Sequence, residues 1–221
     1  MENFEQENIG ANEPVLEQIA TPDRNRRRKP SAEKSCLMYL HDLVYLLAAI
    51  VVVFLLCFRV VVVSGTSMNN TLLDGDYVLL IDNAFCGSFQ LGDIVVASKE
   101  SFDNGEPIIK RVIGVSGQWV DIDFDVGVVY VGDDLDHMVP LDEPYTLTDT
   151  NLYEGVDFPL QVDDGCLFVM GDNRNKSKDS RNPQIGLIDE REVMGKVLLL
   201  FFPGTNDGEY SRDFGRIGVI S

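Results

Sequence analysis

The chain has 221 residues, with 36 Asp or Glu against 18 Lys or Arg, and its formal net charge at pH 7 is −18. From Arg59 onward 28 acidic residues face 12 basic ones, so we expect no nucleic-acid partner, which would need basic patches. Residues 64–221 are enough for one domain with its own hydrophobic core.

Residues 1–35 are predicted to form a disordered cytoplasmic tail. Residues 1–32 are rich in Glu and Asn and almost free of aromatic residues, so they cannot bury enough apolar surface to fold. The tail ends in a basic cluster that is suited to contact with anionic membrane lipid. The cluster consists of Arg24, Arg26, Arg27, Arg28, Lys29 and Lys34.

A long apolar run follows, and we predict a transmembrane anchor over residues 36–63. The run from 43 to 63 is 21 residues long, against about 20 needed to cross a hydrocarbon core. Arg59, near its far end, can extend its charge to the interface. A buried core helix is one alternative. A cleaved signal peptide is another, although the run exceeds the usual apolar length of such peptides.

The flanking charges predict how the anchor is oriented. Positive residues close to a span stay on the cytoplasmic side, and the basic cluster precedes the run. We therefore expect a single pass through the cell membrane, with the N-terminus in the cytoplasm and residues 64–221 outside.

Short β-rich runs predict the fold of residues 64–221. They lie at 77–81, 93–97, 108–115, 127–131, 167–170 and 197–202, separated by glycines and acidic residues. This pattern favours a mostly β domain, an antiparallel sheet or barrel-like fold behind one N-terminal transmembrane helix. Helix signals after the anchor are scarce, with one turn expected at 189–192.

The acidic and apolar alternation at residues 120–127 is predicted to be a half-exposed strand. A calcium loop is the alternative interpretation. A loop beginning at Asp121 would need Gly at its sixth position and Glu at its twelfth, where the chain has Val126 and Gly132. No pair of cysteines has metal-site spacing and the two histidines are isolated, so no metal or cofactor is expected.

Ser67 is the candidate nucleophile. It stands four residues after Val63, at most about 14 Å along an extended chain, so it would act on something at, or leaving, the bilayer. Neither histidine is well placed to serve as its base. His41 lies at the inner end of the span and His137 lies in an acidic, turn-like stretch. A lysine base is the remaining route for a serine enzyme.

Lys110 is the candidate base. Strand alternation puts Ile108 and Val112 on the same face as Lys110. Burial there would lower its pKa from the ordinary value of about 10.4, and Arg111 would add a smaller repulsion. The alternative is a solvated Lys-Arg pair on a strand edge.

Four segments resemble type I signal peptidases, in the same order along the chain. Residues 64–72 (SGTSMNNTL), followed by Gly75-Asp76, resemble the nucleophile segment of that family. Residues 92–96 (GDIVV) resemble its next strand, 110–114 (KRVIG) its general-base segment, and 171–181 (GDNRNKSKDSR) its signature loop. The short interval between Lys110 and Gly171 is similar to the compact form typical of Gram-positive bacteria.

The resemblance implies a membrane-bound serine endopeptidase without a cofactor. Such enzymes remove signal peptides from exported preproteins, usually after small side chains at the first and third positions before the cut. By resemblance Ser67 is the nucleophile, and its backbone N–H helps to stabilise the oxyanion. Lys110 is the general base, and Ser177 hydrogen-bonds Lys110 and fixes its direction.

The remaining residues of these motifs are expected to support the site. Asp179 and Arg181 would pair and brace the loop that presents Ser177, and Asp172 and Asn173 belong with them. Met68 is expected to pack under the nucleophile, as Met often fills irregular gaps.

Two departures from the family pattern bear on the site. Position 70 is Asn where the family usually has Pro, so the turn after Ser67 lacks a fixed φ. Some members place a hydroxyl two residues before the nucleophile as a second oxyanion donor, but that position is Gly65 here, and Ser64 and Thr66 are both open as substitutes. A disulfide between Cys86 and Cys166 is also left open.

Two other functions compete with this interpretation. Self-cleaving LexA-like repressors share a Gly-x-Ser-Met segment and a downstream lysine, but they would carry a DNA-binding domain and lack the pattern of residues 171–181. A membrane-anchored, non-enzymatic β domain is the second. Loss of Ser67, Lys110 or Ser177 would favour it, and all three are present.

Overall fold

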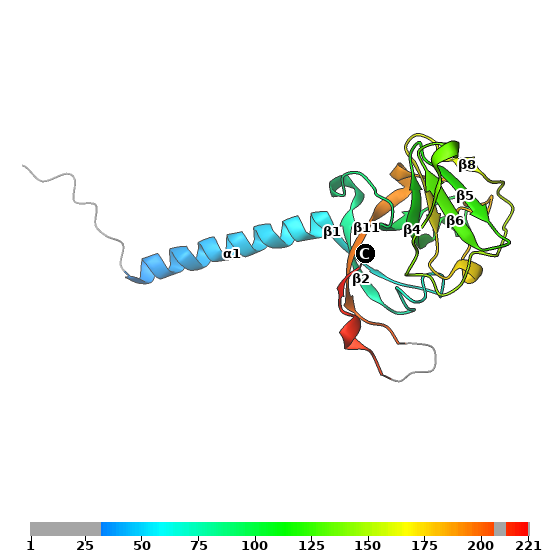
Figure 1. Cartoon of the computed structure of the whole chain (residues 1–221). Helices are drawn as coiled ribbons and strands as arrows, with labels where there is room; N and C mark the ends of the chain where they lie inside the picture. The colour runs from blue at the N-terminus through cyan, green and yellow to red at the C-terminus, as the bar shows by residue number, and fades with distance from the viewer. Residues whose placement is uncertain (1–31, 206–210, 221) are drawn as a thin grey trace, which may run out of the picture. The chain divides into compact units, whose positions relative to one another are not determined.

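The computed structural model describes residues 32–205 and 211–220 (Figure 1). Helix α1 (Ala32–Cys57) contains the stretch Cys36–Cys57, which is long and apolar enough to cross a membrane. None of its most apolar window is buried, whereas a core helix would be mostly covered. The basic cluster predicted at the end of the tail lies outside the described residues, except for Lys34, which belongs to α1.

The structure differs from the anchor predicted over residues 36–63 at both ends. The helix already begins at Ala32, and it ends at Cys57. The next five residues form strand β1 (Phe58–Val62), which pairs antiparallel with β2 (Tyr77–Asp82). A β-branched run such as Val60 to Val62 suits a strand as well as a lipid-facing helix. Arg59 pairs with Asp82 of β2, so its charge is bound within the sheet.

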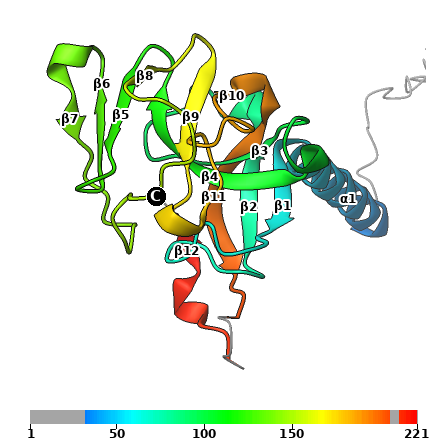
Figure 2. The ribbon, with the colours of Figure 1, turned by 90° about the vertical axis from the view of Figure 1, so that its right-hand side faces the viewer.

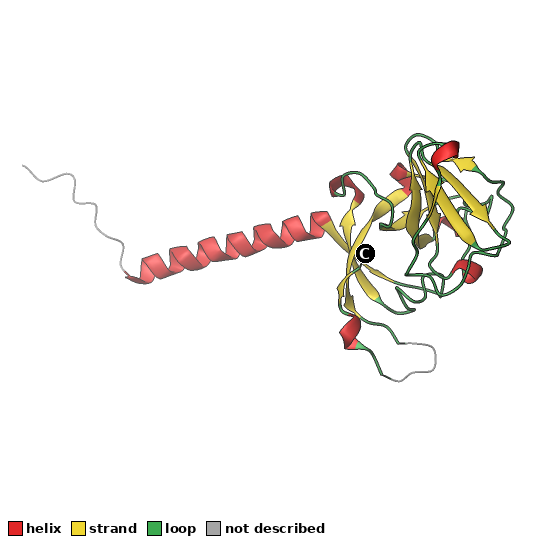
Figure 3. Cartoon of the chain, in the orientation of Figure 1, coloured by secondary structure: helices red, strands yellow, loops and turns green. Residues whose placement is uncertain are grey.

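The strands form two antiparallel sheets (Figures 2 and 3). The first has the order β1-β2-β11-β3-β4-β9-β10, with β12 paired to β11, and the second has the order β7-β6-β5-β8. This arrangement confirms the mostly β, antiparallel class. The other strands of the first sheet are β3 (Ile94–Ser98), β4 (Pro107–Val115), β9 (Cys166–Met170), β10 (Ile188–Asp189), β11 (Val193–Phe202) and β12 (Gly218–Val219). Those of the second are β5 (Trp119–Asp123), β6 (Val128–Gly132), β7 (Val139–Pro140) and β8 (Leu160–Gln161).

Strand β4 is an interior strand of the first sheet and carries Lys110. It pairs with β3, where Val95 lies opposite Lys110, and with β9, where Met170 lies opposite Arg111. Because β9 ends at Met170, the loop that follows starts next to Lys110. The sheet thus fixes the starting point of the signature loop relative to the lysine.

The apolar patterns predicted most of these elements. Each of the six predicted strand regions contains an observed strand, and the predicted turn at 189–192 is a short 3₁₀ helix, Glu190–Glu192, capped by Asp189. Residues 120–127 form strand through Asp123 and then a turn at Gly127, whose φ is +75°. The second sheet fits within the short interval between Lys110 and Gly171, and the thiols of Cys86 and Cys166 are free.

Candidate active site

The segment after β1 forms a compact turn that presents Ser67. Its two ends are joined by backbone hydrogen bonds, from Val63 N–H to Asp76 O at 2.8 Å and from Gly75 N–H to Val63 O at 2.9 Å. Met68, the residue after the serine, is 1% exposed and packs in the core cluster between β1, β2, β3 and β11. The hydrogen bonds between the two ends of the turn and the buried side chain of Met68 therefore hold Ser67 at the surface of the sheet.

Ser67 and Lys110 are in direct contact. The Nζ of Lys110 donates to Ser67 Oγ at 2.8 Å and to the carbonyl of Ile109 at 2.9 Å. Lys110 is 4% exposed and Arg111 is 1% exposed, so the alternative of a solvated Lys-Arg pair is wrong. A hydroxyl beside a buried amine is the geometry that proton transfer between them requires.

Burial lowers the pKa of Lys110 to about 8, because the charged amine loses hydration, while the carboxylates of Asp179 and Asp172 oppose the shift. The repulsive charge that assists the lowering is that of Arg181, not the adjacent Arg111 as predicted. Arg111 is turned the other way by strand alternation and binds Asp172.

A groove of about 400 Å³ opens over the pair. Its walls come from residues 61–64 on one side and 106–110 on the other, and Ser67, Met68 and Lys110 line it. Most of the lining side chains are aliphatic, with Ser64 and Glu106 as the polar exceptions beside the pair. The groove can therefore accept an extended chain with small or apolar side chains.

Asn173 ties the signature loop to the nucleophile turn. Its backbone N–H donates to Ser67 O at 3.0 Å, and its Nδ2 donates to Thr66 O at 3.0 Å. The neighbouring Asp172, which is 0% exposed, accepts two hydrogen bonds from Arg111 at 2.9 and 2.8 Å and one from Thr71 Oγ1. The loop thereby connects the nucleophile turn to the strand that carries Lys110.

The predicted pairing of Asp179 with Arg181 is present in the buried part of the loop. Arg181 donates to both carboxylate oxygens at 2.8 Å, and Asp179 also accepts from the backbone N–H of Gly171 at 3.0 Å. Arg181 additionally donates to the carbonyl of Arg174 at 2.7 Å. Both members of the pair are 0% exposed, so loss of either one would leave the other as an unpaired buried charge, at a cost of about 3–5 kcal/mol.

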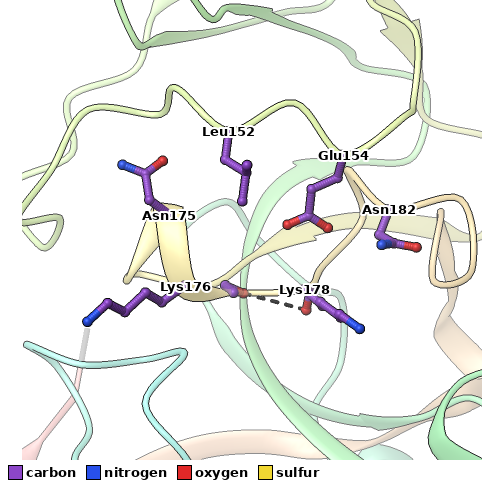
Figure 4. Close-up of a pocket in the computed structure, with 7 residues that line it drawn as sticks. Leu152, Glu154, Asn175, Lys176, Lys178 and Asn182 are labelled. Carbon is purple, nitrogen blue, oxygen red and sulfur yellow. Dashed lines mark hydrogen bonds between the residues drawn. The ribbon is translucent and has the colours of Figure 1, made fainter.

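Ser177 is buried close to the nucleophile, but the predicted hydrogen bond to Lys110 is absent from the described residues. Its hydroxyl instead lies 3.5 Å from the carbonyl of Lys178, a contact drawn in Figure 4. A Cβ placed on Gly171 would lie 2.2 Å from Ser177 Oγ and 2.5 Å from Ser67 O, so only Gly fits between them. The amine of Lys110 is held by Ser67 and Ile109 instead.

Sequence reasoning missed a second, partly buried group around Tyr145. The guanidinium of Arg111 stacks over the Tyr145 ring at 3.9 Å, and the Tyr145 hydroxyl donates to Glu143, which also binds Arg174. Burial raises the pKa of Tyr145, so its hydroxyl stays a donor. No periodic pattern marks Glu143 or Tyr145, because both lie in a loop.

Arg216, near the other end of the chain, was also missed. It donates twice to the 0% exposed carboxylate of Asp76, at 3.0 and 2.7 Å, and once to Thr71 O at 3.2 Å. Asp76 further accepts from the backbone N–H groups of Leu73 and Gly204. The C-terminal segment therefore closes the base of the nucleophile turn.

Two groups near Ser67 are candidates to donate hydrogen bonds to an oxyanion. The backbone N–H of Ser67 donates to no other atom in the part of the chain that the structure describes. Ser64 lines the groove with Ser67, whereas Thr66 does not, so Ser64 is the better placed of the two substitutes for the hydroxyl missing at Gly65.

Known proteins resemble the chain over most of its length. The family model for signal peptidase, peptidase S26, matches residues 36–202. The chain belongs to this family. It is 36% identical to signal peptidase I of Bacillus licheniformis, over 66% of this chain and 77% of that protein. It is 33% identical to signal peptidase I T of Bacillus subtilis, over 83% of this chain and 95% of that protein.

A solved structure also matches the chain. It is the crystal structure of a signal peptidase I from Enterococcus faecalis V583, at 28% identity and a TM-score of 0.39, covering 50% of this chain and 97% of that one. As a member of the signal peptidase family, this chain is a hydrolase, a serine peptidase that removes signal peptides from preproteins. The LexA-like and non-enzymatic interpretations are therefore wrong.

Asn70 gives the turn of this signal peptidase a shape that proline cannot adopt. Its φ is +94°, in the left-handed region, and its Nδ2 donates to the carbonyl of Tyr145 at 3.2 Å. Proline locks φ near −65°, whereas Asn and Gly accept positive values. Proline therefore cannot replace Asn70 in this turn, which is also tied to the Tyr145 loop.

The Asn70→Pro variant is expected to unfold at a lower temperature than the wild type and to lose most of its activity. Forcing this position out of its conformation costs about 1–3 kcal/mol and moves Ser67 away from Lys110. Thermal unfolding and cleavage rate of the detergent-solubilised protein are the measurements. Asn70→Gly is the matched control, since glycine keeps the positive φ. Equal stability and activity of Asn70→Pro would contradict the assigned turn.

Proposed function

We propose that this chain is a membrane-anchored Ser-Lys endopeptidase, in which Ser67 is the nucleophile and Lys110 the general base for removal of signal peptides from exported preproteins. The observation that carries the assignment is the 2.8 Å contact between Ser67 Oγ and the buried Nζ of Lys110. Burial also brings the pKa of Lys110 to about 8, within reach of neutral pH.

The reaction follows from that contact. Ser67 Oγ attacks the scissile carbonyl while its proton passes to the neutral amine of Lys110. The Ser67 N–H, together with Ser64, stabilises the oxyanion that forms. When the tetrahedral intermediate collapses, Lys110 returns the proton to the leaving amine, and the acyl group remains on Ser67. Lys110 then takes a proton from a water molecule that hydrolyses this ester and restores the hydroxyl.

The groove suggests which peptides fit. Its aliphatic walls and its volume of about 400 Å³ suit an extended segment with small side chains. We therefore propose cleavage after small-x-small sequences. No step of this reaction uses a cofactor.

The membrane arrangement completes the proposal. The basic cluster before α1 supports a cytoplasmic N-terminus, in contact with anionic lipid, and an extracytoplasmic peptidase domain. The acidic surface of residues 59–221 argues against a nucleic-acid partner.

The first test is cleavage of a model preprotein, with the cut site read by mass spectrometry. Wild type should cut after a small-x-small sequence. Ser67→Ala and Lys110→Ala should each lower the rate by at least about 10³-fold, because each removes one half of a coupled pair. Ser88→Ala and Lys196→Ala are matched controls outside the groove. A cut that persists in Lys110→Ala would remove the lysine base, and no cut by folded wild type would remove the activity.

The pH profile of kcat/KM provides a second test. Only the neutral amine of Lys110 accepts a proton, so activity should rise with pH and level off above about 8, where the amine is mostly deprotonated. Below that pH the rate should fall roughly tenfold per pH unit. Circular dichroism over the same range controls for unfolding. A flat profile from pH 6 to 10 would contradict a lysine base.

The orientation of the chain in the membrane can be tested with epitope tags in protoplasts. A tag after residue 221 should bind an impermeant antibody in intact cells, whereas a tag before residue 1 should bind only after the membrane is permeabilised. The charge difference across α1 is the physical reason. The opposite labelling would reverse the proposed orientation.

A further inference from the structure

A second cavity, of about 430 Å³, is shown in Figure 4, and Ser177 is among the residues that line it. Leu152 and Glu154 line it from the loop between β7 and β8, Ser177 and Lys178 line it from the signature loop, and Asn182 lines it directly after that loop. The cavity and the groove share no lining residue. Nothing in the mechanism above uses it.

Ser177 connects this cavity to the reacting pair. The space next to Gly171 is so narrow that a single added Cβ would touch both Ser177 Oγ and the backbone oxygen of Ser67. Ser177 is 2% exposed and lines the second cavity. The second cavity therefore adjoins the nucleophile turn through Ser177.

The cavity contains one carboxylate, that of Glu154, which has unused hydrogen-bonding capacity. Its Oε2 is buried and has no hydrogen-bond partner among the described residues. Burial, followed by the charge of Asp179, raises the pKa of Glu154, while Arg181, Asn182 and Lys178 oppose the shift. Because buried polar atoms are nearly always satisfied, such an oxygen marks a place for a donor from outside the chain.

The two lysines at the rim do not supply that donor. Lys176 and Lys178 are exposed, and in Figure 4 their ammonium groups point away from the carboxylate of Glu154. Neither of them forms an ion pair with Glu154 in the described ranges. The carboxylate thus remains free to bind a cationic group that enters the cavity.

From this geometry we infer that the cavity between Glu154 and Ser177 is a subsite for a basic side chain, Lys or Arg, within the first three residues after the cut. The inference rests on the function proposed above, in which the groove holds the residues before the cut. A guanidinium or ammonium group at the floor would donate to Glu154 Oε2, and its aliphatic stem would lie against Leu152.

The test compares preproteins that carry Lys, Gln or Glu at the first, second or third position after the cut, one position at a time. With the full chain in detergent, kcat/KM at one of these positions should favour Lys over Gln by about three- to tenfold, the range of an exposed to a partly buried ion pair. In Glu154→Gln this preference should fall to near one. In Glu154→Lys it should reverse in favour of Glu.

Glu100→Gln is the matched control, because Glu100 is exposed and lines neither cavity. It removes the same charge from an already acidic chain, so a preference caused by overall charge would fall equally in both variants. Retention of the Lys preference in Glu154→Gln, or its absence in wild type, would overturn the subsite. If wild type cuts none of the preproteins, the proposed function fails. Equal cutting of all of them defeats only this inference.

Discussion

The site depends on keeping the amine of Lys110 out of water. The lysine is on an interior strand of the larger sheet, 4% exposed, with β3 on one side and β9 on the other. An amine in that position loses hydration, and this loss is the main reason that its pKa falls to about 8, against the opposing charges of Asp179 and Asp172. The position of Lys110 on this strand therefore sets the basicity of its amine. The rest of the domain has to keep water away from one face of β4 while leaving Ser67 accessible.

The loops around the buried amine of Lys110 are held by buried ion pairs. Arg111, Arg174 and Arg181 are each 1% exposed or less, and each binds a carboxylate from a different part of the chain or the loop. Buried pairs of this kind add little net stability compared with apolar packing, but removal of one partner is costly. Each guanidinium also fixes direction through its planar donors. The pairs thus define one arrangement of the loops that surround Ser67, which apolar contacts alone would leave less specified.

The sequence predicts the parts of this structure that depend on local pattern. Alternating β-branched runs located the strands, and the motif order placed Ser67 and Lys110 together. The Asp179–Arg181 pair was predictable because the two residues are two positions apart. Contacts between residues that only the fold brings together were not predictable. Tyr145 contacts Arg111 from a loop, and no spacing rule connects the two residues. The same limit explains β1, since a run of valines suits lipid and sheet equally until its partner strand is known. The Ser177 hydroxyl lies 3.5 Å from the Lys178 carbonyl and does not bond to Lys110, an arrangement that the pattern does not reveal.

The pair between Asp76 and Arg216 has a consequence for how the enzyme is made. The two residues are 140 positions apart, and the buried carboxylate has no other cationic partner among the described residues. During synthesis the nucleophile turn emerges from the ribosome long before the arginine that neutralises it. Until then, burying Asp76 leaves its charge without a cationic partner, which disfavours the final form of the turn. The peptidase is thus assembled last at the segment that attacks the substrate, and a nascent chain with a complete serine and lysine still lacks a finished active site.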